Sequence, residues 1–205
     1  MIKILSERGA LERLNRIISN FRSEISNYES RAKSCLTCDV NGSCCLDTHF
    51  VNVHISRLEA AAIRNALEKM PVARREAVKS RIDNAIEIYG LSEDGDTFSQ
   101  TFACPLFEKG VGCLVHNEAK PSPCIAHGCY ENKADLPPDR LLAKQEARIE
   151  RLNRQTYGQA ARLLPLPVAI KRAAMSTPLF DIELKGQHQH RLAAAHSIEE
   201  GGEAE

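Results

Sequence analysis

The stretch CLTCDVNGSCC at residues 35–45 contains four of the eight cysteines in this 205-residue chain. The other four, Cys104, Cys113, Cys124 and Cys129, fall in a second cysteine-rich region. The segments with helical periodicity outside these two regions contain none. A cysteine that serves as a small core residue is more often found on the apolar face of a helix. The distribution therefore indicates that these cysteines are metal ligands.

The first region combines two spacings. Cys35 and Cys38 have the C-x2-C spacing that lets two thiolates converge on one ion at about 2.3 Å each. Cys44 and Cys45 are adjacent, and adjacent side chains diverge, so we expect them to serve different metals or only one of them to bind a bridged cluster. Each region alone gives an awkward set of four ligands. The two regions are therefore predicted to meet in space.

The second region is rich in proline and glycine. Prolines flank Cys104 and Cys124 and restrict the backbone there, while Gly110 and Gly112 permit a tight turn that brings Cys113 back. Rigid loops lower the entropy cost of assembling a site. Metal binding would then supply much of the folding free energy of these segments.

Both zinc and an iron–sulfur cluster suit this set of donors. The C-x2-C pair and isolated thiolate tetrads suit zinc, whereas the vicinal pair and eight thiolates also suit a cluster. His116 and His127 lie close to cysteines in the sequence, but a lone loop histidine is more often solvated. The candidate metal ligands are Cys35, Cys38, Cys44, Cys45, Cys104, Cys113, Cys124 and Cys129.

The order of these pieces resembles the YkgJ-type cysteine-cluster family, which is described as zinc- or iron-chelating. Its members have an early C-x2-C…C-C group, an apolar segment leading into a helix with a Glu near its start, and a later C-P-x-L…G-x-C…(R/K)-P-x-x-C run. The matching pieces here are residues 35–45, residues 51–59, Cys104-Pro105-Leu106, Gly112-Cys113 and Lys120-Pro121-Ser122-Pro123-Cys124, with Cys129 last. The resemblance covers residues 35–129 and implies metal chelation. A related motif occurs in flagellin lysine methylases, but no large catalytic module is evident here.

Hydrophobic periodicity predicts a mainly α fold in which helices support the two cysteine-rich metal-binding loops. The predicted helices cover residues 11–28, 56–70, 72–89, 137–164 and 168–175. Ser56 and Glu59 have the spacing of a capping box, in which each side chain satisfies a backbone N–H. Alternating apolar and polar residues at 49–55 predict one short strand.

The chain is expected to divide into four segments. Residues 1–34 form an N-terminal amphipathic helix, and residues 35–136 form the cysteine-cluster metal-binding region. Residues 137–196 form C-terminal helices that pack on that region. Residues 197–205 contain four glutamates and two glycines and are expected to be a disordered acidic tail.

The charges give no global field. Lys+Arg and Asp+Glu are equal at 27 each, so nothing steers the chain as a whole toward nucleic acid or an anionic membrane. A local basic stripe lies on the predicted long helix: Arg140, Lys144, Arg148 and Arg151. Asp139, Glu146 and Glu150 sit among these cations, so we expect a solvated, ion-paired face rather than a nucleic-acid contact.

The cellular compartment is predicted from two features of the sequence. No segment approaches the roughly 20 apolar residues that span a bilayer, and residues 1–8 turn charged before any signal-peptide core can form. We therefore expect a cytoplasmic protein, in a reducing compartment where cysteines do not persist as disulfides. The expected partner is a metal ion. A protein partner of unknown identity is compatible with the sequence, no membrane is expected, and nucleic acid is not favoured.

The predicted function is metal chelation in a structural or redox role. Two alternatives stay open. One is a thiol-redox protein in which Cys44 and Cys45 form a reversible disulfide. The other is a metal-dependent, methylase-associated enzyme with an open cysteine or metal position. No acid–base pair, phosphate-binding P-loop or G-x-S-x-G elbow supports an enzyme, so the sequence leaves that question undecided.

Overall fold

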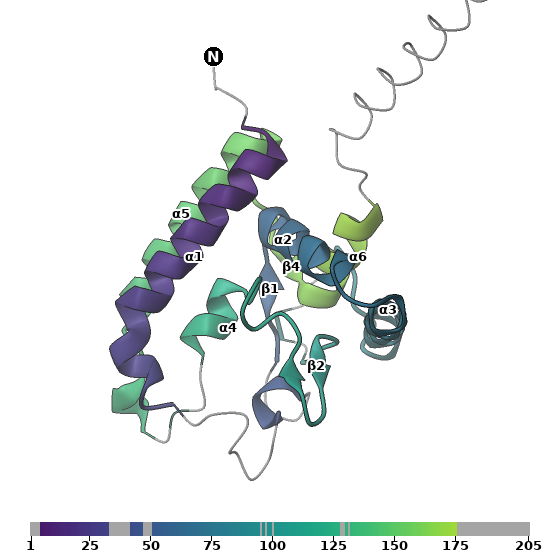
Figure 1. The fold of residues 1–205 in the computed structure, drawn as a ribbon, viewed down its shortest axis with the longest axis horizontal. Helices are drawn as coiled ribbons and strands as arrows, with labels where there is room; N and C mark the ends of the chain where they lie inside the picture. The colour runs from purple at the N-terminus through teal and green to yellow at the C-terminus, as the bar shows by residue number, and fades with distance from the viewer. Residues whose placement is uncertain are drawn as a thin grey trace, which may run out of the picture. The chain divides into compact units, whose positions relative to one another are not determined.

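The computed structural model describes residues 5–32, 42–46, 51–94, 96, 98–99, 101–127, 130 and 132–175. Across these residues the fold consists of six α-helices, two short 3-10 helices and two antiparallel sheets of two strands each (Figure 1). The predicted mainly α class is confirmed. None of the helices in these ranges is long and apolar enough to cross a membrane. The predicted acidic tail at 197–205 lies outside the described residues.

The helices are α1 (Glu7–Glu29), α2 (Arg57–Glu68), α3 (Val72–Ile88), α4 (Ser122–Ala126), α5 (Asp139–Tyr157) and α6 (Leu166–Met175). The 3-10 helices are η1 (Ser43–Cys45) and η3 (Lys133–Asp135). The strands are β1 (His54–Ile55), β2 (Phe107–Glu108), β3 (Gly112–Cys113) and β4 (Leu164–Pro165). β1 pairs with β4, and β2 pairs with β3.

Local capping explains several helix ends. The Ser6 hydroxyl accepts a hydrogen bond from the backbone N–H of Gly9, so α1 begins earlier than the apolar periodicity predicted. At the start of α2, Ser56 and Glu59 form the predicted capping box. The prediction that α5 continues to residue 164 is wrong. Gly158 adopts a left-handed conformation with φ of 73° and ends the helix after Tyr157.

Two elements, β1 and α4, differ from the predictions. A strand was expected at residues 49–55. Of its described residues, 51–55, only His54 and Ile55 form a strand, β1, which is held by pairing with the distant β4. Helix α4 was not predicted, because Pro121 and Pro123 make its sequence look like a loop. Proline is nevertheless compatible with the first turn of a helix, where the missing N–H would have no partner.

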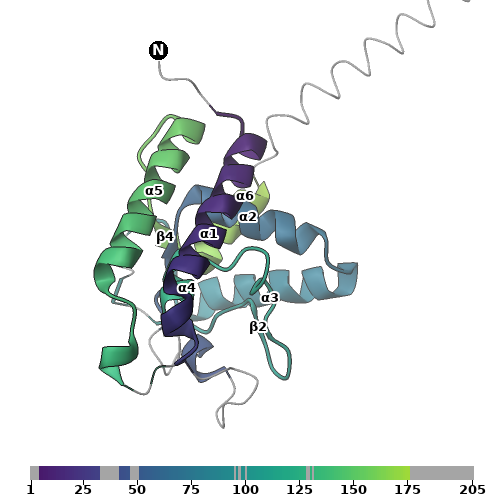
Figure 2. The same cartoon turned by 60° about the vertical axis from the view of Figure 1, so that its left-hand side comes forward.

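The core is aliphatic, with few aromatic side chains. Ile55, Ile63, Leu166 and Ile170 are almost completely buried in the cluster that joins α2, α3 and α6, together with Phe102. α1 packs along α5, and α4 contacts both of these helices (Figures 1 and 2). These contacts place α4, which carries Cys124, against the helical scaffold.

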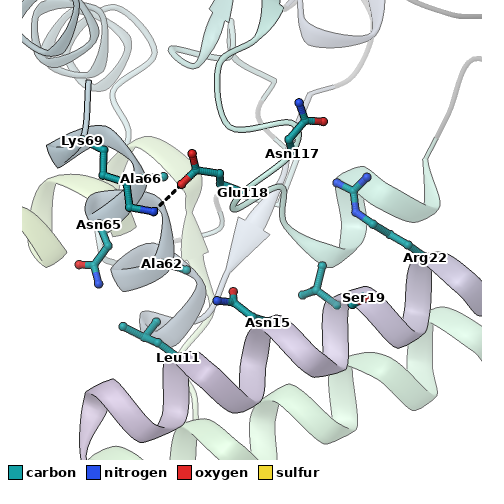
Figure 3. Close-up of a pocket in the computed structure, with 11 residues that line it drawn as sticks. Leu11, Asn15, Ser19, Arg22, Ala62, Asn65, Ala66, Lys69, Asn117 and Glu118 are labelled. Atoms are coloured by element: carbon teal, nitrogen blue, oxygen red, sulfur yellow. Dashed lines mark hydrogen bonds and ion pairs between the residues drawn. The ribbon is translucent and has the colours of Figure 1, made fainter. Parts of the chain in front are cut away.

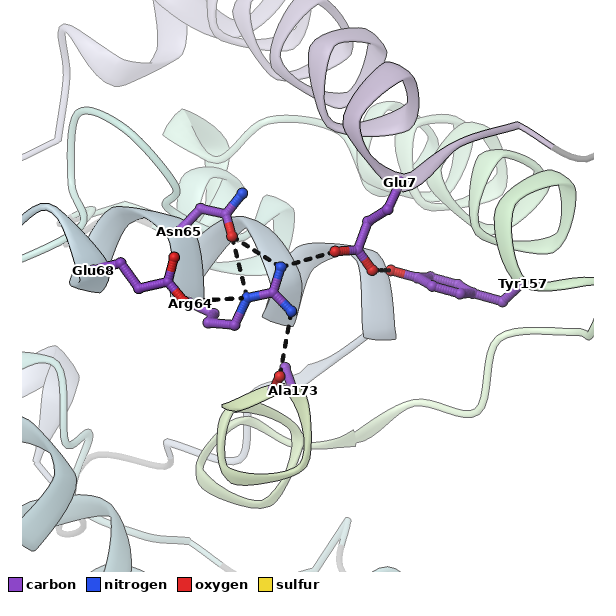
Figure 4. Close-up of polar contacts among 6 residues, drawn as sticks. All are labelled: Glu7, Arg64, Asn65, Glu68, Tyr157 and Ala173. Carbon is purple, nitrogen blue, oxygen red and sulfur yellow. Dashed lines mark hydrogen bonds and ion pairs between the residues drawn. The ribbon is translucent and has the colours of Figure 1, made fainter. Parts of the chain in front are cut away.

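A buried arginine connects four helices (Figure 4). Arg64 on α2 donates to the Glu7 carboxylate at 2.8 Å, and to the backbone carbonyl of Ala173 in α6 at 3.3 Å. The hydroxyl of Tyr157, at the end of α5, donates to the same carboxylate at 2.6 Å. Burial alone would raise the pKa of Glu7, but the hydrogen bonds from Tyr157 and Arg64 outweigh it and lower the pKa overall.

Replacing Tyr157 with phenylalanine should destabilise the fold by about 1.5–3 kcal/mol at neutral pH, because a hydrogen bond to a charged acceptor is lost. The pKa of Glu7 is lowered in the folded state, so its contribution is present above the unfolded pKa and is lost as pH falls through the folded pKa. The difference between wild type and variant should therefore shrink in acid. Urea denaturation of wild type and variant, at neutral pH and in acid, measures this difference in stability. Tyr28→Phe is the matched control, since Tyr28 lies near the other end of α1, against a separate hydrophobic cluster.

Candidate metal centre

One cysteine of the first loop lies against the second loop. The backbone N–H of Cys104 donates to the carbonyl of Cys45 at 2.9 Å, and the side chains of the two residues also form a hydrogen bond. Cys45 is close enough to Cys113 for their charges to interact. Helix η1, which carries Cys45, therefore brings a thiol to the β2–β3 hairpin.

A glycine makes this approach possible. Gly42 precedes η1 with φ of 82°, and its carbonyl accepts the Cys45 N–H at 2.8 Å to close the turn. A Cβ atom at Gly42 would lie 1.9 Å from Cζ of Phe107 in β2. Only a residue without a side chain lets η1 sit this close to the hairpin.

Gly42→Ala should therefore push η1 away from the hairpin and separate Cys45 from Cys104. Gly110→Ala is the matched control, because Gly110 has φ of 80° but open space around its Cα. Each variant carries the left-handed backbone cost of about 1–2 kcal/mol, and only Gly42→Ala adds the clash. Thermal unfolding should show a clearly larger loss for Gly42→Ala. An equal loss in the two variants would contradict the close packing of η1 on Phe107.

The hairpin positions the next two cysteines. In the β2–β3 register Cys113 is opposite Phe107, whose N–H donates to the carbonyl of Cys104 at 3.1 Å. Gly110 and Gly112 both have positive φ, as the tight turn requires. Cys104 and Cys113 are thereby held on the two arms of one short turn structure.

Cys124 is positioned by a buried carboxylate. Glu59 in α2 is 6% exposed, and its Oε1 accepts from the N–H of Ser122 at 3.2 Å and from its hydroxyl at 2.9 Å. Its Oε2 accepts from the N–H of Ser56 at 3.0 Å and from its hydroxyl at 2.9 Å. One carboxylate therefore ties the start of α2 to the start of α4, two residues before Cys124. The capping box was visible in the sequence, but the second half of this contact was not.

The thiols shift one another's pKa values through hydrogen bonds and electrostatic interactions. The hydrogen bond with Cys104 is the main reason that the pKa of Cys45 is raised to about 12, and burial and the charge of Cys113 add to it. Burial raises the pKa of Cys124 to about 12, with further contributions from Cys113 and Cys45. Cys45, Cys104 and Cys124 carry thiols that are not in disulfides. Cys45, Cys104, Cys113 and Cys124 thus form one connected group drawn from both loops, which we call the thiol group.

The remaining candidate ligands are placed less completely. Cys35, Cys38 and Cys129 lie outside the described residues. Cys44 is exposed, and its thiol forms a hydrogen bond with Cys45. His116 and His127 are both exposed, as expected of solvated loop histidines.

Among the residues with described positions, no three His, Cys, Asp or Glu side chains are arranged as the ligands of a single ion. The described cysteines of the thiol group are therefore near one another but do not form a complete set of ligands for one ion. Closing it around an ion requires side-chain rotation or the cysteines at positions outside the described ranges.

A cavity of about 590 Å³ lies between α1, α2 and the turn after β3 (Figure 3). Its rim is polar and includes an ion pair in which Lys69 Nζ lies 2.6 Å from a Glu118 carboxylate oxygen. None of the cysteines with described positions lines this cavity, so it is separate from the group formed by Cys45, Cys104, Cys113 and Cys124.

Comparison with models of protein families, with characterised proteins and with solved structures gives no match to this chain. Its function is therefore argued from the chemistry of the thiol group itself.

Proposed function

We propose that this chain binds a metal centre, either zinc or an iron–sulfur cluster, through thiolates from both cysteine-rich loops. The observation that carries the proposal is the connected group of Cys45, Cys104, Cys113 and Cys124, in which a cysteine of the first loop contacts one of the second through both backbone and side chain. Four thiols gathered from two distant loops are an unusual feature for a hydrophobic core but a common one for a metal site.

The donor chemistry supports zinc and iron–sulfur equally. Thiolate is the soft ligand that both prefer, and four thiolates are the usual complement for either. Thiolates that converge on one site repel one another unless a cation lies between them. When bound, zinc would supply a link between the loops, and a cluster would supply electron transfer as well. Cys35, Cys38, Cys44 and Cys129 remain proposed ligands, of the same centre or of a second one. The resemblance to the YkgJ-type family agrees with this assignment.

A thiol-redox role is the second candidate, because the neighbouring thiols of Cys44 and Cys45 interact. A reactive cysteine, however, is one whose pKa is lowered so that the thiolate is present at neutral pH. The pKa of Cys45 is raised to about 12, which favours the unreactive thiol in the absence of metal. The metal centre is therefore the preferred function.

Elemental analysis and a visible absorption spectrum of the protein, purified without oxygen, test the proposal. Stoichiometric zinc in a colourless protein, or iron and sulfide with charge-transfer bands in a brown one, supports it. A protein that contains neither metal, and that unfolds identically with and without a chelator, would contradict it. A reversible Cys44–Cys45 disulfide in such a metal-free protein would favour the redox alternative.

A further inference from the structure

The outward face of the α1–α5 pair is more basic than the sequence suggested. An ion pair marks this face, with Lys144 Nζ of α5 3.0 Å from a carboxylate oxygen of Glu24 in α1. Residues four and seven positions apart on a helix share a face. Arg148 and Arg151 therefore lie on the same face of α5 as Lys144, and both are exposed.

α1 adds two arginines to the same face. Arg16 and Arg13 lie about two and three turns before Glu24, on its side of the helix, and both are exposed. The two helices run antiparallel, since the backbone N–H of Leu5 donates to the carbonyl of Gln155 at 2.9 Å. The part of α1 between its start and Glu24, which carries Arg13 and Arg16, therefore lies alongside the segment of α5 that carries Arg148 and Arg151.

Two carboxylates of α5 line a cavity rather than this face. Glu146 and Glu150 line a cavity of about 280 Å³ together with Glu59. Glu150 also pairs with Arg154, at 3.4 Å. Among the described residues, the expected pairing of this stripe with the acids of α5 is not found. Lys144 pairs with Glu24 of α1 instead, and Glu150 pairs with Arg154, which is not part of the stripe.

The four arginines are not neutralised locally. Glu12 on α1 pairs with Arg8 at 3.5 Å, and Glu24 is occupied by Lys144. Within the described part of the chain, no carboxylate lies within ion-pair distance of the four arginines. We call this surface the basic face, and its members are Arg13, Arg16, Arg148 and Arg151.

We propose that the basic face binds the phosphate backbone of double-stranded nucleic acid. Arginine presents a planar fork of donors that matches phosphate oxygens two at a time. Neighbours on one helix are about 5–6 Å apart, and packed helices are about 8–10 Å apart. Two pairs of guanidinium groups on adjacent helices therefore cover several phosphates of a duplex, which carries one charge per about 1.7 Å of its axis.

The composition of the face distinguishes among polyanions. The exposed large apolar side chains of the described residues all lie outside α1 and α5, so the face lacks the apolar wedge with which an amphipathic helix enters a membrane. The aromatic residues of these two helices, Phe21, Tyr28 and Tyr157, are buried or half-buried. Without exposed rings the face cannot stack single-stranded bases, and a duplex is favoured. The basic face contains none of the proposed metal ligands, so this inference does not rest on the metal centre.

Fluorescence anisotropy of a labelled DNA duplex, titrated with the full-length metal-loaded protein at several salt concentrations, tests the inference. Each phosphate contact contributes about −0.9 to the slope of log K against log salt, so four contacts predict a slope of about −3.6. Arg148→Gln/Arg151→Gln should reduce the slope to about −1.8 and weaken binding at low salt. Arg13→Gln/Arg16→Gln should have the same effect, which keeps the test decisive if one variant fails to fold.

The matched control removes two exposed cations from α3, as Arg74→Gln/Lys79→Gln, and should retain the wild-type slope. Metal content and melting temperature establish that each variant is folded. The inference is overturned if the control loses as much affinity as the basic-face variants, or if the duplex does not bind at low salt. Binding to phosphatidylserine vesicles without binding to the duplex would overturn it as well.

Discussion

Cys104→Ser should lose most of its bound metal and unfold at a markedly lower temperature than wild type. Cys104 contacts Cys45 through both its backbone N–H and its side chain, so it lies where the two loops meet. A serine hydroxyl is a much poorer ligand than a thiolate for zinc or an iron–sulfur cluster. Binding of a structural zinc contributes about 10–16 kcal/mol in small domains, so losing one of four ligands should remove several kcal/mol. Elemental analysis and thermal unfolding measure both effects.

The sharpest form of this experiment is a double-mutant cycle. Cys45→Ser should behave like Cys104→Ser, and the double variant should lose little more, because the proposal assigns both residues to one centre. Val111→Ser is the control, since it places a serine at a 48% exposed position in the same hairpin without removing a thiol. Unchanged metal content in Cys104→Ser, or fully additive losses in the double variant, would contradict a shared centre.

Glu59→Ala should be the most destabilising change away from the cysteines. Its carboxylate accepts four hydrogen bonds from Ser56 and Ser122, and all four are buried. Each buried donor left without a partner costs about 1–3 kcal/mol, and partial relaxation should leave a net loss of about 3–4 kcal/mol. Because α4 loses its tie to α2, Cys124 should also be held less firmly and metal should dissociate faster.

Urea denaturation and the rate of metal transfer to a chelator measure the two effects of Glu59→Ala. Glu150→Ala is the control, because Glu150 lines the same cavity but makes only an exposed pair with Arg154. Such a surface pair contributes about 0.3–0.5 kcal/mol. Equal losses in Glu59→Ala and Glu150→Ala would show that the link to Ser122 does not support α4.

Local signals in the sequence predicted most helices well. The Ser56–Glu59 spacing marks the start of α2, and α3 ends at Ile88, one residue before the predicted end. The end of α5 was predicted seven residues too late. The apolar spacing continues past Gly158, and only the left-handed conformation of this glycine ends the helix.

The features that organise the candidate site depend on contacts between distant residues. Glu59 and Ser122 are 63 positions apart in the chain, and no local pattern joins them. The approach of η1 to the hairpin depends on the space that Phe107 leaves at Gly42, which is a property of packing. The basic face likewise emerges only when α1 and α5 lie side by side. Spacing in the sequence predicted which residues would bind a metal but not which of them lie next to one another.

X-ray absorption at the metal edge tests the central claim most directly, using wild type, Cys45→Ser and Cys113→Ser purified without oxygen. The claim predicts a metal–sulfur shell at about 2.3 Å in wild type, with four sulfurs per metal. The sulfur count should fall in both variants, because one ligand comes from each loop. A shell made only of oxygen and nitrogen, or a sulfur count that responds to the loss of one cysteine and not the other, would contradict a centre shared between the two loops.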